Sequence, residues 1–150
     1  MTWSLATLTA DGTRVGLDSS ILIYLSHGEG ARAEAAAIIV DAVADGRIVG
    51  IVATTALVEV LAGLARADDA AGFERAASAL ASMGLAIRAL DTEIAAGAAW
   101  LRGGGMGFED AVHVATARAE RADLFLTNDR RIRSRPSLEV VYLDDLVETS

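Results

Sequence analysis

Residues 109–131 have the sequence EDAVHVATARAERADLFLTNDRR, and the interpretation of the whole chain starts from this stretch. Asp110 stands at the start of a helical pattern, and Asp129 follows a short apolar run that is typical of a strand. A helix that packs against the strand following it runs antiparallel to that strand, so its N-terminus lies at the edge where the strand ends. We therefore expect Asp110 and Asp129 to lie close together in space.

The rest of the chain alternates apolar runs with helical patterns, as α/β proteins with parallel sheets do. The expected strands are Val15–Leu17, Arg47–Ala53, Leu85–Leu90, Leu124–Thr127 and Leu138–Leu143. The expected helices are Ile21–Leu25, Arg32–Ala44, a segment that starts at Thr54 or Thr55 and ends within Arg66–Asp69, Ala70–Met83, a segment from Asp91 or Thr92 to Leu101, and Phe108–Arg121. We predict one α/β domain over residues 1–150, a three-layer sandwich with a central, mostly parallel five-stranded sheet. Residues 1–14 are expected to form an N-terminal arm or an edge strand.

The composition excludes several kinds of chemistry. All 13 basic residues are arginine, so Schiff-base chemistry and a Walker-type phosphate loop, which need lysine, are excluded. The chain has no cysteine, which excludes disulfides and thiolate metal sites. The formal net charge of −8 argues against broad nucleic-acid binding, but it leaves open a small site where metal ions supply the positive charge.

No segment is typical of a signal peptide or of a membrane-spanning helix. The N-terminus lacks a basic start followed by an apolar run. The longest uncharged stretch, Ile48–Val58, is shorter than the roughly 20 residues that a spanning helix needs. We expect a soluble, cytoplasmic protein with no membrane partner.

Four acidic residues are expected at one edge of the sheet. Asp18 follows the first strand, Glu59 lies near the start of the helix after the second, and Asp110 and Asp129 flank the fourth. Two unit charges about 4 Å apart repel by about 4 kcal/mol at an effective dielectric of 20, so such a cluster needs a cation or extra protons. One acid near a helix N-terminus has an ordinary structural explanation, because it complements the helix dipole. Four together favour a hard divalent cation, Mg²⁺ or Mn²⁺, over zinc.

Four segments of the chain resemble the motifs of PIN-domain nucleases, and in particular the VapC-type toxins of bacterial toxin–antitoxin pairs. These segments are LDSSILIYL from Leu17, TTALVEV from Thr54, FEDAVHVATA from Phe108 and LFLTNDRR from Leu124. The resemblance implies a PIN-like fold and places the catalytic acids at Asp18, Glu59, Asp110 and Asp129. It also implies Mg²⁺- or Mn²⁺-dependent cleavage of RNA, a homodimer, and a small cognate antitoxin that blocks the site.

With this resemblance, each acid receives an expected role. Asp18 and Asp110 are assigned as metal ligands, and Asp129 as a ligand that binds directly or through water. Glu59 is either a further ligand or the group that orients the attacking water. Around them, hydrogen bonds to the ligands or to a phosphate are expected from Ser19, Thr127 and Asn128, although Asn128 is equally well explained as a turn residue.

Several nearby residues have two interpretations. The arginines that follow the fourth strand, and Arg102, either contact RNA phosphates or belong to surface loops; those after the strand are Arg130, Arg131, Arg133 and Arg135. The loop Gly103–Gly107 is either a mobile segment facing the substrate or a connector, which we favour. His113 is expected to be a packed or rim residue rather than a phosphate ligand.

The leading functional hypothesis is a metal-dependent endoribonuclease that acts as the toxin of a type II toxin–antitoxin system. The alternative is a non-catalytic PIN-like module whose acidic pocket receives an arginine from a partner protein. A phosphotransfer domain is disfavoured, because such domains need a lysine near the phosphorylated aspartate and this chain has none.

Overall fold

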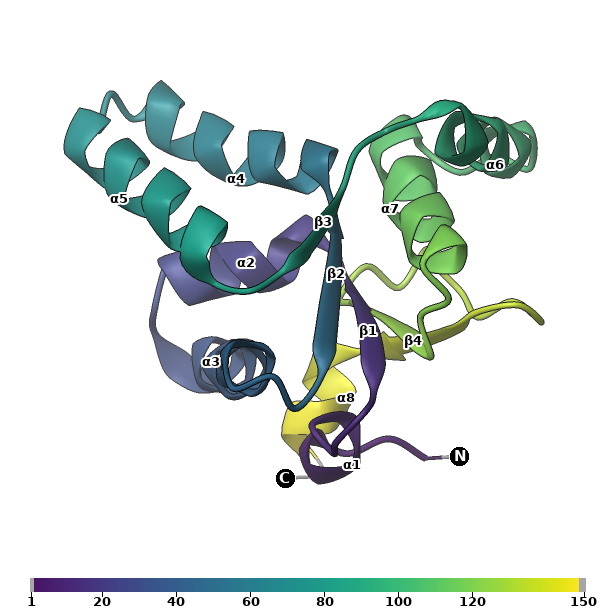
Figure 1. Cartoon of the computed structure of the whole chain (residues 1–150), viewed down its shortest axis with the longest axis horizontal. Helices are drawn as coiled ribbons and strands as arrows, with labels where there is room; N and C mark the ends of the chain where they lie inside the picture. The colour runs from purple at the N-terminus through teal and green to yellow at the C-terminus, as the bar shows by residue number, and fades with distance from the viewer. Residues whose placement is uncertain (1, 149–150) are drawn as a thin grey trace.

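The computed structural model describes residues 2–148, which form a parallel sheet with helices on both faces (Figure 1). The strands are β1 (Arg14–Leu17), β2 (Val49–Ala53), β3 (Ala86–Arg88), β4 (Leu124–Thr127) and β5 (Glu139–Tyr142). The helices are α1 (Leu5–Leu8), α2 (Ser19–Ser26), α3 (Gly30–Ala44), α4 (Thr54–Arg66), α5 (Ala70–Ser82), α6 (Thr92–Gly103), α7 (Phe108–Ala119) and α8 (Leu143–Glu148). The strand order is β3-β2-β1-β4-β5, and every neighbouring pair is parallel. The predicted α/β class with a central five-stranded sheet is confirmed.

The central strand β1 sets the position of the site. It pairs with β4 so that Leu17 lies opposite Leu126, and the backbone N–H of Asp18 donates to the Leu126 carbonyl at 3.1 Å. The residues that follow the paired ones, Asp18 and Thr127, therefore lie side by side at the carboxyl edge of the sheet. The other side of β1 pairs with β2, which leads into α4 and carries Glu59 to the same edge.

Helix α7 packs closely on β1, and a glycine makes this possible. A Cβ atom at Gly16 would lie 2.6 Å from the Ala117 Cβ, closer than packed side chains allow, and 3.1 Å from the ring of Phe125, closer than most packed Cβ contacts. The absence of a side chain at Gly16 lets the helix lie against the strand. The tight contact fixes α7, and with it Asp110 and His113, relative to the end of β1.

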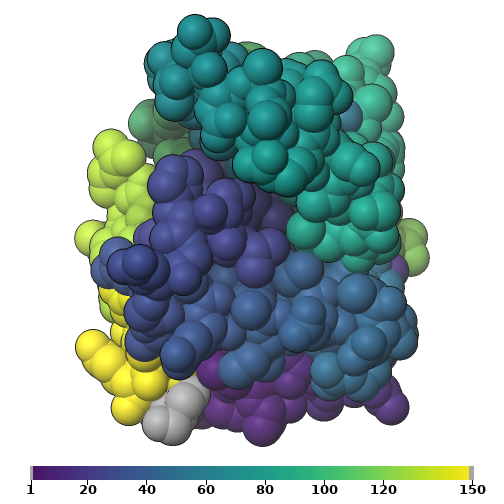
Figure 2. Space-filling view, turned by 90° about the vertical axis from the view of Figure 1, so that its left-hand side faces the viewer, coloured from purple at the N-terminus to yellow at the C-terminus, as the bar shows by residue number. Residues whose placement is uncertain are grey.

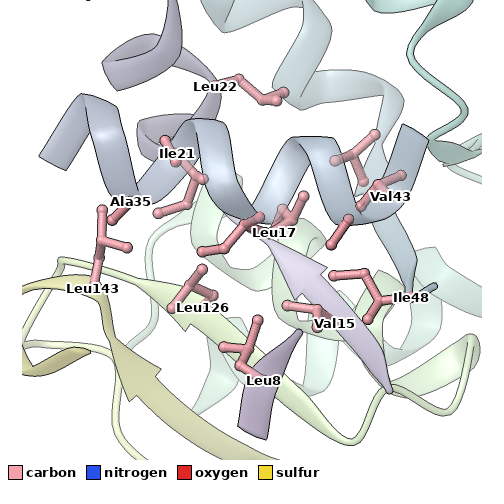
Figure 3. Close-up of a cluster of buried hydrophobic side chains, with 14 of the residues drawn as sticks. Leu8, Val15, Leu17, Ile21, Leu22, Ala35, Val43, Ile48, Leu126 and Leu143 are labelled. Atoms are coloured by element: carbon pink, nitrogen blue, oxygen red, sulfur yellow. The ribbon is translucent and has the colours of Figure 1, made fainter. Parts of the chain in front are cut away.

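Two apolar clusters lie on opposite faces of the sheet. On one face, α2 and α3 cover β1, β2 and β4 (Figure 1), and the buried side chains between them include Leu17, Ile21 and Leu126 (Figure 3). Figure 2 shows this side of the molecule from outside, where α2 and α3 lie below α5. On the other face, α6 and α7 enclose Phe125 and Ile94. Burial on both faces explains why the strands are continuous apolar runs rather than alternating ones.

The N-terminal prediction was wrong. Instead of an arm or edge strand, the chain forms the short helix α1, and Arg14 begins the central strand β1. Ser4 and Thr7 form a reciprocal capping box at the start of α1, and Leu8 at its end is fully buried in the core. A helix this short is fixed by its cap and one anchoring side chain, which leaves no periodic pattern in the sequence.

Several expected boundaries also moved. Strand β2 begins at Val49 rather than Arg47, because the amides of Arg47 and Ile48 bond back to the Ala42 carbonyl at the end of α3. The fifth strand ends at Tyr142, and the chain then forms α8, which the sequence analysis did not predict. Across the described residues, no helix is long and apolar enough to cross a membrane.

Candidate active site

Asp18 is the most buried of the four acids and is held by hydroxyl groups. It ends β1 and stands at the N-cap position of α2, and it is only 7% exposed. The hydroxyl of Thr127 donates to its Oδ2 at 2.6 Å. The hydroxyl of Ser19 lies 3.3 Å from Asp18 Oδ1 and 2.8 Å from Glu59 Oε2. A hydroxyl has a single proton, so the shorter contact to Glu59 is the favoured donation.

His113 links Asp18, which follows β1, with Glu59 on α4. Its Nδ1 lies 3.4 Å from Asp18 Oδ1, and its Nε2 lies 3.1 Å from Glu59 Oε1. Neither contact meets the geometric criteria for a hydrogen bond, but both nitrogens lie close enough to the carboxylates for each acid to stabilise the protonated imidazole. Burial alone would lower the pKa of His113, but the two carboxylates outweigh it and raise this pKa to about 9.

The bridging role of His113 is the main functional feature that the sequence analysis missed. The side chain is packed, as expected, but it also faces two of the acids. A sequence signal was present, because His113 follows Asp110 by three positions on α7 and so lies on the same face of the helix.

The charges on these neighbours set the ionisation of Asp18. Burial by itself raises the pKa of this carboxyl, but the contacts with His113 and Thr127 chiefly outweigh burial and lower the pKa below its usual value. Asp18 is therefore ionised at neutral pH and is available as an anionic ligand.

Asp110 and Asp129 complete the acidic group from the other side. The pKa of Asp110 is raised, first by burial and then by the negative charges of Asp18 and Asp129. Asp129 has a lowered pKa, because the guanidinium of Arg131 lies 2.8 Å from its Oδ2 and the Arg131 amide donates to its Oδ1 at 3.0 Å. The Asp129 amide donates in turn to the Thr127 hydroxyl at 3.0 Å, which joins this loop to Asp18. Among these three acids, repulsion between carboxylates therefore affects mainly Asp110, the one whose pKa is raised.

Asn128 lies away from the acidic group. Its amide nitrogen donates to the Tyr24 hydroxyl and to Asp144 Oδ1, each at 3.1 Å, and its Oδ1 accepts from the Asp144 amide. These bonds tie the end of β4 to α2 and α8. Of the two interpretations of Asn128, the structure favours the turn residue. The neighbouring Arg130 pairs with Asp145 at 2.7 Å.

The donor atoms of this group fit a hard divalent cation. Carboxylate oxygens are the ligands that Mg²⁺ and Mn²⁺ prefer. The Oε1 atom of Glu59 is buried without a hydrogen bond, and the raised pKa of Asp110 marks an excess of negative charge that a cation relieves. Within residues 2–148, no three His, Asp or Glu side chains are arranged as a ready-made metal site, and the charges of His113 and Arg131 partly neutralise the acids.

The fold and this edge define a class of α/β protein in which a parallel sheet gathers acidic side chains at the carboxyl ends of its central strands. The chain belongs to the PIN domain family, whose model matches residues 15–138. No curated protein matches the chain significantly in sequence.

Solved structures that share the fold include the following three. One is described as VapBC2 from Rickettsia felis bound to a DNA fragment from its promoter, with a TM-score of 0.65 and 16% identity. The second is a toxin–antitoxin complex from Klebsiella pneumoniae, with a TM-score of 0.62 and 20% identity. The third is DNA-bound VapBC from Salmonella typhimurium, with a TM-score of 0.59 and 17% identity. Each match covers 87% of this chain and 98% of the other.

Proposed function

We propose that this PIN-domain protein is a Mg²⁺- or Mn²⁺-dependent endoribonuclease and the toxin of a type II toxin–antitoxin system. The observation that carries the proposal is that Asp18, Asp110 and Asp129 come together at one sheet edge, where burial and then the charges of Asp18 and Asp129 raise the pKa of Asp110. A group with a raised pKa of this origin, at the edge where parallel sheets bind ligands, is typical of a functional site.

The chain's own residues have distinct tasks in this proposal. Asp18, Asp110 and Asp129 hold the cation, which when bound activates water and neutralises charge on the phosphate. Thr127 fixes the carboxylate of Asp18 through the 2.6 Å hydrogen bond. Glu59, which contacts Ser19 and His113, is a ligand or orients the attacking water.

A small antitoxin is the proposed protein partner. Support comes from the solved structures that share the fold, which are described as VapBC or toxin–antitoxin complexes. An apolar groove of about 380 Å³ lies between α2, α4 and α5, and it offers a surface for an apolar antitoxin segment. Leu22, Leu25, Val60, Leu64 and Leu80 are among the residues that line it.

We also propose a homodimer. The side chain of Val58 on α4 is 66% exposed, and Ile38 on α3 is also exposed, so apolar surface remains for contact between copies. Light scattering coupled to size-exclusion chromatography tests this, and a purified chain with the mass of one copy at micromolar concentration would contradict it.

The alternative function is a binding module whose acidic pocket receives a partner's arginine. The specific observation in its favour is the contact of Arg131 with Asp129, which shows that a guanidinium fits at this acidic rim. The two functions predict different responses to metal, since only the nuclease needs a divalent cation for its activity.

A cleavage assay on single-stranded and structured RNAs tests the proposal. The wild-type protein should cleave RNA when Mg²⁺ or Mn²⁺ is added and should stop when a chelator is added. Asp18→Asn, which keeps the shape but removes the charge, should abolish cleavage. Asp41→Asn changes an exposed acid on α3 and serves as the matched control that keeps activity. A wild-type protein inactive with both metals on every RNA, or an active Asp18→Asn variant, would overturn the proposal.

A further inference from the structure

Phe108 is a large apolar side chain that the core does not use. It is the first residue of α7, it is 54% exposed, and it precedes Asp110 by two positions. Most other large apolar side chains of α6 and α7 are buried in the cluster around Phe125. An exposed ring directly beside an acidic site is suited to contact with a ligand rather than to stability.

The surface around Phe108 is hollowed toward Asp110. One hollow of about 410 Å³ is lined by Gly107, Phe108, Glu109, Asp110 and Arg131. A second, of about 330 Å³, is lined by Gly104–Gly107, Asp110, Arg131, Ile132 and Arg135. Because Gly107, Asp110 and Arg131 line both hollows, the two adjoin at the acidic site.

Glycine keeps this surface open. A Cβ atom added at Gly105 or Gly107 would meet nothing within 4 Å, so side chains there would project into free space. Gly105 also has a φ of +102°, a conformation that other residues rarely adopt. The segment Gly103–Gly107, from the last residue of α6 to the residue before α7, therefore presents backbone to the hollow except at Met106, whose side chain packs against the cluster around Phe125, and a flat ligand can approach this backbone closely.

Three arginines lie at or near these two hollows although the chain as a whole is acidic. The guanidinium of Arg102 lies 6.0 Å from the centre of the Phe108 ring. Arg135 lines the second hollow and donates to the Arg133 carbonyl. Arg131 lines both hollows and pairs with Asp129. An aromatic face with arginines around it is the combination that binds single-stranded nucleic acid, with bases on the ring and phosphates on the arginines.

We propose that Phe108 and the glycine loop form a subsite for one unpaired RNA base next to the phosphate held at the acidic site. This inference rests on the proposed ribonuclease function and adds how the substrate is held. The base stacks on the ring of Phe108 and lies along the backbone of Gly104–Gly107. Arg102 and Arg135 contact the phosphates on either side. The subsite requires a nucleotide that is free of pairing, so the substrate is a single-stranded segment or a loop.

Steady-state cleavage kinetics with single-stranded RNA test the subsite. Phe108→Ala should raise KM by roughly 5- to 100-fold with little change in kcat, the effect of losing one base–aromatic stack. Phe108→Trp, which keeps an aromatic face, should restore the wild-type KM. Trp100→Ala is the matched control, because Trp100 is 83% exposed on α6 but lines neither hollow.

A binding measurement separates this inference from the proposed function. Fluorescence anisotropy with a labelled single-stranded RNA is measured on Asp18→Asn, which is not expected to cleave, with and without Phe108→Ala. Weaker binding by the same roughly 5- to 100-fold supports the subsite. Failure of the wild-type protein to cleave RNA would count against the ribonuclease alone. The subsite alone would be overturned if Phe108→Ala left the RNA affinity of Asp18→Asn unchanged and, where the wild type cleaves RNA, also left KM unchanged.

Discussion

Replacing Thr127 with valine should destabilise the protein measurably, since its hydroxyl makes two buried contacts. The side chain is fully buried, donates to Asp18 at 2.6 Å and accepts from the Asp129 amide at 3.0 Å. A hydrogen bond to a charged group contributes about 1.5–3 kcal/mol, and an amide that loses its acceptor costs about 1 kcal/mol more. Thr127→Val keeps the shape and the branched Cβ, so we expect the free energy of unfolding to fall by about 2.5–4 kcal/mol.

Urea denaturation followed by circular dichroism, in chelator at neutral pH, measures this loss. Thr127→Ser keeps the hydroxyl and loses only a methyl group, so its loss should be about 1 kcal/mol. A loss below about 1 kcal/mol in Thr127→Val, or equal losses in the two variants, would refute the reasoning from the hydroxyl.

The difference in unfolding free energy between the wild type and Thr127→Val should depend on pH. The folded-state pKa of Asp18 lies below its usual value. The ionised carboxylate therefore stabilises the folded protein at pH values above the unfolded-state pKa, and this stabilisation is lost as the pH falls through the folded-state pKa. The difference between wild type and Thr127→Val should narrow in acid, and a constant difference would show that the lost contact does not depend on the charge of Asp18.

Three further substitutions, and Gly103→Ala as the control for one of them, probe other parts of the structure. Asp110→Asn should raise the Tm of the metal-free protein at neutral pH, because it removes a charge that burial and acidic neighbours disfavour, and should lose the further rise given by Mg²⁺; an unchanged Mg²⁺ response would contradict its role as a ligand. Gly16→Ala should cost about 1–3 kcal/mol in urea denaturation, because its Cβ meets Ala117. In Gly103→Ala the new methyl group enters open space, so this variant should not destabilise the protein. Equal losses of unfolding free energy in Gly16→Ala and Gly103→Ala would contradict the explanation by the clash with Ala117. Asp91→Ala should lower Tm at neutral pH, because this carboxylate caps α6 and its pKa is lowered by the cap and by a neighbouring arginine. The difference in Tm between the wild type and Asp91→Ala should disappear as the pH falls through the lowered pKa of Asp91, and a difference that does not change with pH would contradict the role of the charge.

The arrangement of strands and helices could be predicted because it depends on patterns along the chain. The buried strands are apolar runs, and the helix that carries Asp110 has a clear period next to the strand that leads to Asp129. General rules for parallel sheets then place both acids at one edge. The short helices α1 and α8 were missed. Helix α1 depends on a capping box and one buried leucine, and α8 has only six residues with Leu143 and Leu146 buried, so neither is long enough to show a clear period.

The contacts between side chains within the site could not be predicted from patterns in the sequence. That His113 faces both Asp18 and Glu59 depends on how closely α7 approaches β1 and α4, which is a property of the packed structure. The pairing of Arg131 with Asp129 depends on the turn after β4, where the Arg131 amide also bonds the carboxylate. The types and order of residues in the sequence predict which side chains lie at the same edge of the sheet. Which of these side chains are in contact depends on the tertiary packing.

The bond between Thr127 and Asp18 joins groups 109 positions apart. During synthesis, Asp18 leaves the ribosome early but gains its partner only after β4 has been made and has joined the sheet. A product of interrupted translation that ends before this point lacks Asp129 as well as the hydroxyl that orients Asp18. If the chain is the ribonuclease proposed above, such incomplete copies lack part of the acidic site, and RNA cleavage is expected only from chains that include β4 and Asp129.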